Sequence, residues 1–317
     1  MSGFGDGRSL EGLGCRHRPS RWLADRPGRN HHQRVRLRDE GVVMTFDRMA
    51  RPHSVRWGDR GAAVVCIHAG MGSSRQWRAL GETLCADYRV IAGDIAGMGR
   101  SPPWPEGHGL SVDDDVIHWA PIVDEAGPVF HLVGHSYGGA LAIKLALAMP
   151  ARIRSLVLYE PTLFRLLVAE QPPPVVAEEI IRHRADIAGL IEQGAFALAA
   201  ERFITYWAGD HAWNMMSDAA RQASLDWAPR LKLEWDKLFE DRITPTDLGA
   251  IVCPTLVLKG AQSHRSTHAL ADLIGRRIPA ANTVLIDDVG HMGPLQASAT
   301  VNAIIREFVQ GVDSSRA

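Results

Sequence analysis

The sequence predicts an α/β fold, in which a mostly parallel sheet carries helices on both faces and a helical cap is inserted late in the chain. Short apolar segments alternate with helical patterns along most of its length, which is typical of such sheets. A glycine-flanked serine also stands between an apolar run and a stretch of small helical residues, at 134–138. Ligands of these folds bind beyond the carboxyl ends of the strands, so we expect the functional site there.

The strands and helices expected for the core follow one another in order. The strands are 62–67, 88–92, 129–133, 155–159, 255–258 and 283–286. The helices are 76–85, 111–125, 139–149, 267–277 and 300–310. The helix that follows the serine should stop before Pro150, because the residue preceding a proline is disfavoured in helical conformation.

The segment 161–246 interrupts this alternation, since it holds helical patterns and no convincing strand. We therefore expect a core of 44–160 and 247–317, with 161–246 as a helical cap over the site. The expected cap helices are 175–193, 196–207, 217–227 and 230–239. The cap is rich in aromatic residues, namely Phe164, Phe203, Trp207, Trp213, Trp227 and Trp235. As substrate-binding candidates we name Trp207, Trp213 and, from an earlier loop, Met71.

Composition excludes several classes of function. The 317 residues carry a formal net charge of −1, so neither a nucleic acid nor an acidic membrane surface is an expected partner. Apolar runs are short and interrupted by charges, so no transmembrane helix is expected. The four cysteines, Cys15, Cys66, Cys85 and Cys253, show no metal-binding or CxxC spacing. We interpret them as reduced thiols in a cytoplasmic protein.

Residues 1–43 differ from the rest of the chain, because they are rich in arginine and glycine and lack apolar periodicity. The continuous apolar core of a secretory signal is absent. We expect a disordered leader or an upstream extension before a start at Met44, with a basic binding arm as the alternative.

Ser136 is the candidate nucleophile. The segment Gly134-His135-Ser136-Tyr137-Gly138 joins a strand to a helix, which is the arrangement of the G-x-S-x-G nucleophile elbow. The tight turn leaves no room for side chains at its two glycines. It also places the serine at a helix N-terminus, where unpaired amides and the helix dipole favour negative charge.

A serine nucleophile needs a base and an oxyanion hole. His291, in a loop that follows the last expected strand, is the candidate base. His135 adjoins the serine, but its side chain must point away from the nucleophile, so we expect a structural role. The backbone amide of Tyr137 is one expected oxyanion donor, and that of Gly70, in the loop at 68–72, is the other.

Together these motifs resemble the α/β-hydrolase fold superfamily. The matching segments are H-A-G-M-G at 68–72, D-I-A-G-M-G-R-S at 94–101, G-H-S-Y-G at 134–138 and G-H-M-G-P-L at 290–295. The first departs from the commoner H-G-G-P-G by having Ala69 and Met71. The second resembles a turn that shapes the core of the family's fold, so Asp94 receives no catalytic role. The candidate residues also follow the order Ser…acid…His that the resemblance implies.

The carboxylate that would orient the candidate base departs from the common family pattern. Ser263 occupies the usual position, and its segment 259–265 contains no carboxylate. Glu160 ends the strand after the elbow, where some members such as haloalkane dehalogenases carry the acid. We therefore expect Glu160 to complete a triad with Ser136 and His291. A structural glutamate at the junction with the cap is the competing interpretation, and Asp287 and Asp288 are the alternative acids.

The resemblance implies a serine hydrolase with a Ser-His-Glu triad that acts on a small to medium ester, lactone or thioester with an apolar group. A carbon–carbon bond hydrolase acting on a diketone is the alternative. A non-hydrolytic lyase or oxygenase, or a non-catalytic receptor for a small ligand, also stays open. A serine at the elbow argues against epoxide hydrolysis and dehalogenation, which use a carboxylate nucleophile in this family. No metal or organic cofactor is implied; the expected partner is a small-molecule substrate, and a homodimer is possible.

Overall fold

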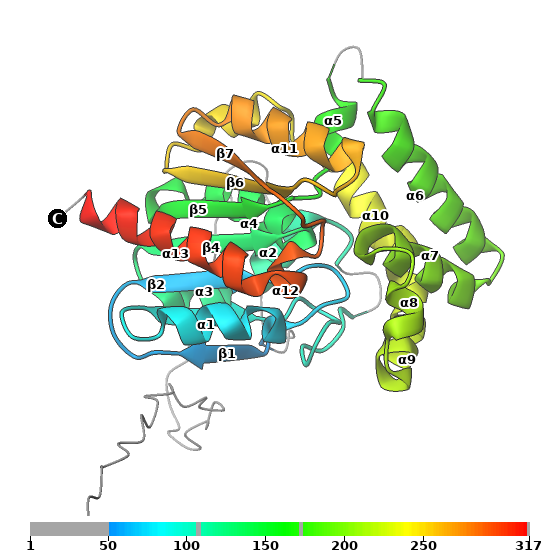
Figure 1. Cartoon of the computed structure of the whole chain (residues 1–317), viewed down its shortest axis with the longest axis horizontal. Coiled ribbons are helices and arrows are strands. Elements are labelled where there is room, and N and C mark those ends of the chain that lie inside the picture. Colours follow the sequence, from blue (N-terminus) through cyan, green and yellow to red (C-terminus); the bar gives the residue numbers. More distant parts are fainter. Residues whose placement is uncertain (1–50, 106–108, 171–173, 316–317) are drawn as a thin grey trace, which may run out of the picture.

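A computed structural model describes residues 51–105, 109–170 and 174–315, and in it seven strands form one sheet (Figure 1). Their order is β1-β3-β2-β4-β5-β6-β7, and only the β1–β3 pair is antiparallel. The strands are β1 (Ser54–Trp57), β2 (Ala63–Ile67), β3 (Arg89–Gly93), β4 (Phe130–His135), β5 (Ile153–Tyr159), β6 (Thr255–Gly260) and β7 (Ala281–Ile286). The predicted α/β fold with a mostly parallel sheet is confirmed. The predictions made for residues 1–43 lie outside the described residues.

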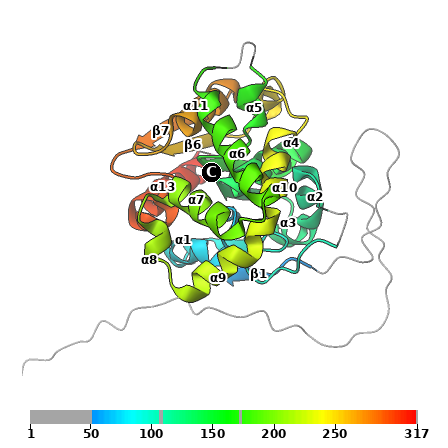
Figure 2. The same ribbon diagram turned by 90° about the vertical axis from the view of Figure 1, so that its right-hand side faces the viewer.

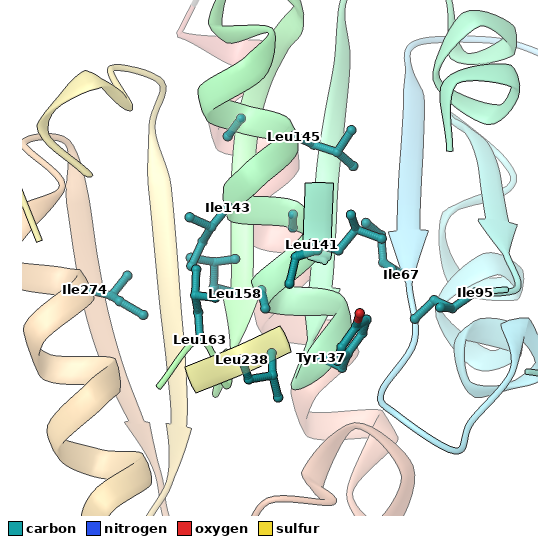
Figure 3. Close-up of a cluster of buried hydrophobic side chains, with 14 of the residues drawn as sticks. Ile67, Ile95, Tyr137, Leu141, Ile143, Leu145, Leu158, Leu163, Leu238 and Ile274 are labelled. Atoms are coloured by element: carbon teal, nitrogen blue, oxygen red, sulfur yellow. The ribbon is translucent and has the colours of Figure 1, made fainter. Parts of the chain in front are cut away.

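Helices cover both faces of the sheet, because each face of a buried parallel sheet must be shielded from water. One face carries α2 (Val112–His118), α3 (Ala120–Ala126), α4 (Tyr137–Ala148) and α11 (Arg265–Arg277). The other carries α1 (Arg78–Leu84) and α13 (Ser298–Ser314). Figure 3 shows Leu141 and Leu145 of α4 and Leu158 of β5 in the first of the two resulting cores. The small side chains of α4 allow it to lie close against the strands.

The structure differs from the sequence prediction at the helix expected for 111–125 and at strand β1. The helix expected at 111–125 is divided into α2 and α3 at Trp119, since Pro121 in the first turn of α3 lacks the N–H that would continue α2. Strand β1 was not predicted: it is four residues long, pairs only with β3 and buries one of its residues, so its apolar pattern is weak.

The helices between β5 and β6 form a separate layer beside one end of the sheet (Figure 1). Figure 2 views this layer face on, with α6, α7 and α10 nearest the reader. They are α5 (Arg165–Val168), α6 (Ala177–Glu192), α7 (Phe196–Ala208), α8 (Ala212–Met215), α9 (Asp218–Trp227) and α10 (Leu231–Phe239). The four long helices agree with the expected segments, and the two short ones, α5 and α8, are additions.

The remaining elements are short. They are η1 (Ser74–Trp77), η2 (Pro150–Arg152), η3 (Ala228–Arg230), η4 (Asp247–Ala250) and α12 (Gly293–Gln296). Within the described ranges, no helix combines the length and the apolar character needed to cross a membrane. Cys66 and Cys253 are buried free cysteines, and Cys15 lies outside the described residues.

Candidate active site

Ser136 stands in a strained turn between β4 and α4. Its φ of 57° and ψ of −121° are unfavourable for a residue with a side chain, and such strain is concentrated at functional sites. A Cβ at Gly134 would lie 2.4 Å from the carbonyl oxygen of Gly138. A Cβ at Gly138 would lie 2.4 Å from the carbonyl oxygen of Ile67. Glycine is therefore required at both positions, because the neighbouring backbone lies too close for a side chain.

Replacing Gly138 by alanine should destabilise the fold, because both atoms nearest the new methyl group are backbone oxygens, of Ile67 and His68. Overpacking of this kind costs about 1–3 kcal/mol, and urea unfolding measures it. Gly311→Ala in α13 is the matched control, since nothing lies within 4 Å of that position. It should stabilise the helix by up to about 1 kcal/mol. Equal unfolding midpoints for the two variants would contradict the role assigned to Gly138.

Three side chains form a continuous hydrogen-bonded chain at the carboxyl end of the sheet. The Oγ of Ser136 lies 2.9 Å from Nε2 of His291, and Nδ1 of His291 lies 2.8 Å from Oε2 of Glu160. Because a carboxylate only accepts, Nδ1 carries the proton and Nε2 is free to accept from the serine hydroxyl. The structure thus brings together the three residues predicted from widely separated parts of the sequence.

The carboxylate of Glu160 is fully buried and fully hydrogen-bonded. Its Oε1 accepts from the backbone N–H of Gly260 and from the hydroxyl of Ser263, each at 2.6 Å. Glu160 has a φ of 41°, so this junction is strained as well. Ser263, which stands where the family resemblance places the acid, donates this hydrogen bond to Glu160.

Two side chains beneath the site hold the loop that carries His291. Nε2 of His135 donates to the carbonyl of His291 at 2.8 Å, and the hydroxyl of Tyr159 donates to the carbonyl of Gly290 at 2.8 Å. Burial, together with the neighbouring His291, holds the pKa of His135 well below its usual value, so its ring is neutral. His135 therefore contacts the loop of the candidate base, not the hydroxyl of Ser136.

The loop after β2 brings Gly70 beside the elbow. A Cβ on Gly70 would lie 3.8 Å from the Cβ of Tyr137, and both residues line the same cavity as Ser136. Tyr137 is the first residue of α4, where backbone N–H groups have no partner within the helix. Nδ1 of His68 donates to the carbonyl of Ala69 at 2.7 Å, and Nε2 accepts from the N–H of Ile95 at 3.0 Å. These bonds fix the backbone that presents Gly70.

A largely apolar cavity extends from Ser136 into the helical layer. It encloses about 670 Å³ of empty space, including its opening to solvent. Of the predicted pocket residues, Trp207 lines it and lies 4.3 Å from the His291 ring, measured between ring centroids. Met71 and Trp213 are not among its lining residues; both are partly buried and pack against the apolar core. The other aromatic lining residues are Tyr137, Phe164, Phe203, Trp227 and Trp235.

The other carboxylates near the motifs lie elsewhere. Asp94 accepts from the backbone N–H groups of Ser74 and Arg100, at 2.5 and 2.9 Å, and so shapes the turn that follows β3. Asp287 and Asp288 are exposed at the end of β7, and neither contacts His291 in the hydrogen bonds of the described residues. In those same ranges, no cluster of three His, Cys, Asp or Glu side chains could hold a metal ion.

A buried polar cluster behind the cavity was missed by sequence analysis. Lys237 of α10 donates to Asp115 of α2 at 3.1 Å and forms an ion pair with Glu234 at 3.3 Å. The hydroxyl of Tyr137 donates to Asp115, and the indole N–H of Trp104 donates to its other oxygen at 3.0 Å. Glu234 and Lys237 are spaced like an exposed helical ion pair, so no sequence signal separates them from surface residues.

Comparison with known proteins agrees with the fold. The alpha/beta hydrolase family matches residues 64–304. Lipase LipV of Mycobacterium tuberculosis is 29% identical over 275 residues, which cover 80% of this chain and 96% of the lipase. The pimeloyl-[acyl-carrier protein] methyl ester esterase of Aeromonas hydrophila is 25% identical over 81% of this chain and 98% of its own. A malate-bound esterase from Thermogutta terrifontis superposes with a TM-score of 0.65 at 25% identity, over 82% of this chain and 93% of that one.

Proposed function

Because this chain belongs to the alpha/beta hydrolase family, we propose that it is a serine hydrolase with a Ser136–His291–Glu160 triad. Its substrate is a small to medium ester, lactone or thioester that carries an apolar group. The observation that carries the proposal is the unbroken chain from the Ser136 hydroxyl through His291 to the Glu160 carboxylate, at 2.9 and 2.8 Å. These three hydrogen-bonded side chains lie beside a cavity with aromatic walls, which Ser136 and His291 help to line.

In the first half of the reaction, the Ser136 hydroxyl attacks the substrate carbonyl while Nε2 of His291 takes its proton. Glu160 keeps the proton on Nδ1 and stabilises the imidazolium that forms. The carbonyl oxygen becomes an oxyanion and accepts hydrogen bonds from the backbone amides of Tyr137 and Gly70. Each such donor contributes about 10²–10³ to turnover. When the bond to the leaving group breaks, His291 returns the proton to that group, which leaves an acyl-serine.

In the second half, water attacks the acyl-serine while His291 again takes a proton. The acid is released when the bond to Ser136 breaks and His291 protonates the serine oxygen. No step needs a reactant besides the ester and water, since the proton moves only between Ser136, His291, the leaving group and water.

The segment 161–246 is the proposed cap of this site. Its helices α7, α9 and α10 supply aromatic side chains to the cavity, among them Trp207, Trp227 and Trp235. An apolar acyl or alcohol group would bury its surface there, at about 25 cal/mol per Å² removed from water. The walls therefore favour apolar substrates over highly charged ones.

Labelling with a fluorophosphonate tests the proposal. Wild-type protein should gain the mass of one phosphonyl group, because only an activated serine attacks such reagents. Folded Ser136→Ala and heat-denatured wild type should both stay unlabelled. An adduct that persists in Ser136→Ala, or none on folded wild type, would contradict the assignment of the nucleophile.

A panel of p-nitrophenyl esters, lactones, thioesters and diketones then identifies the reaction class. Turnover of esters that disappears in Ser136→Ala supports acyl-ester hydrolysis. Cleavage of a diketone into an acid and a ketone, without turnover of any ester, would replace this proposal by carbon–carbon bond hydrolysis at the same site.

A further inference from the structure

A half-buried histidine joins the helical layer to the loop beside the proposed triad acid. Nε2 of His264 lies 2.8 Å from the carbonyl oxygen of Tyr206 in α7, and Nδ1 lies 2.8 Å from Oε1 of Glu179 in α6. His264 directly follows Ser263, whose hydroxyl donates to Glu160. One side chain therefore connects two helices of the layer to the loop that supports the carboxylate of the proposed triad.

Both ring nitrogens of His264 face oxygens that act as acceptors. The carbonyl of Tyr206 has no proton to give, so Nε2 donates to it. Glu179 already accepts on each oxygen, from the Tyr206 hydroxyl on Oε1 and from the backbone N–H of Ser266 on Oε2, both at 3.3 Å. A lone pair on Nδ1 would meet those of the carboxylate at 2.8 Å and be repelled, so Nδ1 carries a proton as well. His264 is therefore an imidazolium in this arrangement.

The ring of Tyr206 lies between two histidine rings. Its centroid is 3.7 Å from that of His264 and 3.8 Å from that of His183, at interplanar angles of 2° and 15°, so the histidines cover opposite faces. A cation over the face of a tyrosine is attracted by the π-electrons. Burial, and then the charge of His264, lowers the pKa of His183 to about 4, so that ring is neutral. Burial raises the pKa of Tyr206, so its hydroxyl stays protonated.

Other titratable and charged side chains surround this junction. The groove beside it is lined by Asp186 of α6, Glu201 and Arg202 of α7, Asp210 and His291, and α11 adds Arg265 and His268. Arg202 lies 3.7 Å from Asp186, so these two charges offset each other. Within the described ranges, only Glu179 among the carboxylates forms an ion pair with His264. Loss of the ring's charge would therefore act on the contact with Glu179.

The peptide group that His264 holds also carries a wall of the active-site cavity. The Tyr206 carbonyl belongs to the peptide bond that joins Tyr206 to Trp207. The ring of Trp207 lines the cavity and lies 4.3 Å from the ring of His291, between centroids. It also lies 4.8 Å from the ring of Tyr206. The placement of this wall beside the candidate base therefore depends on the contacts of His264.

We propose that His264, as an imidazolium, is a positioning residue that holds α6 and α7 against the core and so fixes Trp207 as a wall of the substrate cavity. It acts through Tyr206 and Trp207, not on the reacting atoms. Its side chain is 36% exposed, so it exchanges protons with solvent. A ring that loses its second proton keeps only one of the two contacts, and histidines ordinarily do so near pH 6.5. The inference rests on the proposed serine hydrolase function, and it predicts that substrate binding weakens as the pH rises through this range.

The test is the pH dependence of KM for p-nitrophenyl hexanoate, followed at the isosbestic wavelength of the released phenol. His264→Gln has no charge at any pH. Its KM should exceed that of wild type about fivefold near pH 5.5 and equal it near pH 8.5, as expected for a charge-assisted contact that is partly exposed. Comparing the two proteins at each pH cancels the titration of His291. Their kcat values should agree within about twofold, because the triad residues keep their mutual contacts.

His264→Arg keeps the charge at every pH, because a planar guanidinium donates hydrogen bonds, stacks on aromatic rings and stays protonated. Its KM should equal that of wild type near pH 5.5 and lie about fivefold below it near pH 8.5. His211→Gln is the matched control, since it removes an exposed histidine of the same helical layer. Its KM should follow that of wild type throughout.

Hydrogen exchange provides a readout that needs no substrate. Near pH 5.5, the amides of α7 should exchange about fivefold faster in His264→Gln than in wild type or His264→Arg, because the contact with the Tyr206 carbonyl no longer comes from a charged ring. The amides of α13, on the far face of the sheet, should exchange equally in all three proteins.

The outcomes separate this inference from the proposed function. If the ester is hydrolysed but the KM ratio of His264→Gln to wild type does not change with pH, the role of His264 is overturned and the serine hydrolase stands. Faster exchange of α7 without a change in KM overturns it too, as does an equal effect of His211→Gln. If no ester is hydrolysed and the fluorophosphonate does not label wild type, the proposed function is overturned, and this inference with it.

Discussion

Glu160→Gln is expected to lower kcat by up to about 10⁴, while the protein stays folded. In wild type, the Glu160 carboxylate accepts from Nδ1 of His291 at 2.8 Å and so leaves Nε2 free to take the proton of Ser136. A glutamine can donate its amide N–H to Nδ1 instead. The proton then resides on Nε2, and the histidine cannot act as a base. Turnover of the best p-nitrophenyl ester, with circular dichroism to verify the fold, measures the effect.

Three substitutions serve as controls for Glu160. Asp287→Asn and Asp288→Asn should keep turnover near that of wild type, because both carboxylates are exposed. Ser263→Ala removes one of two donors to Oε1 and leaves the contact with His291, so about a tenfold loss is expected. Near-wild-type turnover in folded Glu160→Gln, with a large loss in either aspartate variant, would move the acid to the end of β7.

Lys237→Met should be the most destabilising single substitution proposed, at about 3–5 kcal/mol of unfolding free energy. The side chains of Lys237 and Asp115 are each 1% exposed, and their ion pair joins α10 of the proposed cap to α2 of the core. The substitution leaves two buried carboxylates, Asp115 and Glu234, close together without the ammonium group between them. Burial lowers the pKa of Lys237, but the charges of Glu234 and Asp115 outweigh it and the net shift is upward, so the lysine is charged in the fold.

Lys232→Met is the matched control on the same helix. Lys232 is 43% exposed and pairs with Asp236 one turn along the helix, an arrangement that contributes roughly 0.3–0.5 kcal/mol. Urea unfolding of both variants measures the difference. If Lys237→Met unfolds at the same urea concentration as Lys232→Met, the buried cluster does not hold the helical layer to the core.

Much of the fold followed from local pattern. Runs such as 62–67 and 155–159 are almost wholly apolar, because parallel strands are buried on both faces, and the sequence places both strands within about two residues. Strand β1 was missed because an edge strand with one buried residue has neither an apolar run nor a clear alternation. The sequence predicts one helix across Trp119 and Pro121, where α2 ends and α3 begins, because the apolar periodicity continues across this break.

Some residues of the candidate site can likewise be predicted from local sequence, whereas others cannot. Local sequence is enough to predict the elbow at Ser136, since its glycines, serine and flanking elements are contiguous, and to suggest His291 from its place after the last strand. Which side chains meet depends on the folded arrangement: parallel strands bring their carboxyl ends to one edge, so Glu160 reaches His291 across 131 positions of sequence. The same holds for Glu234 and Lys237, because burial and pairing of a charge depend on neighbours from other elements, which no local pattern records.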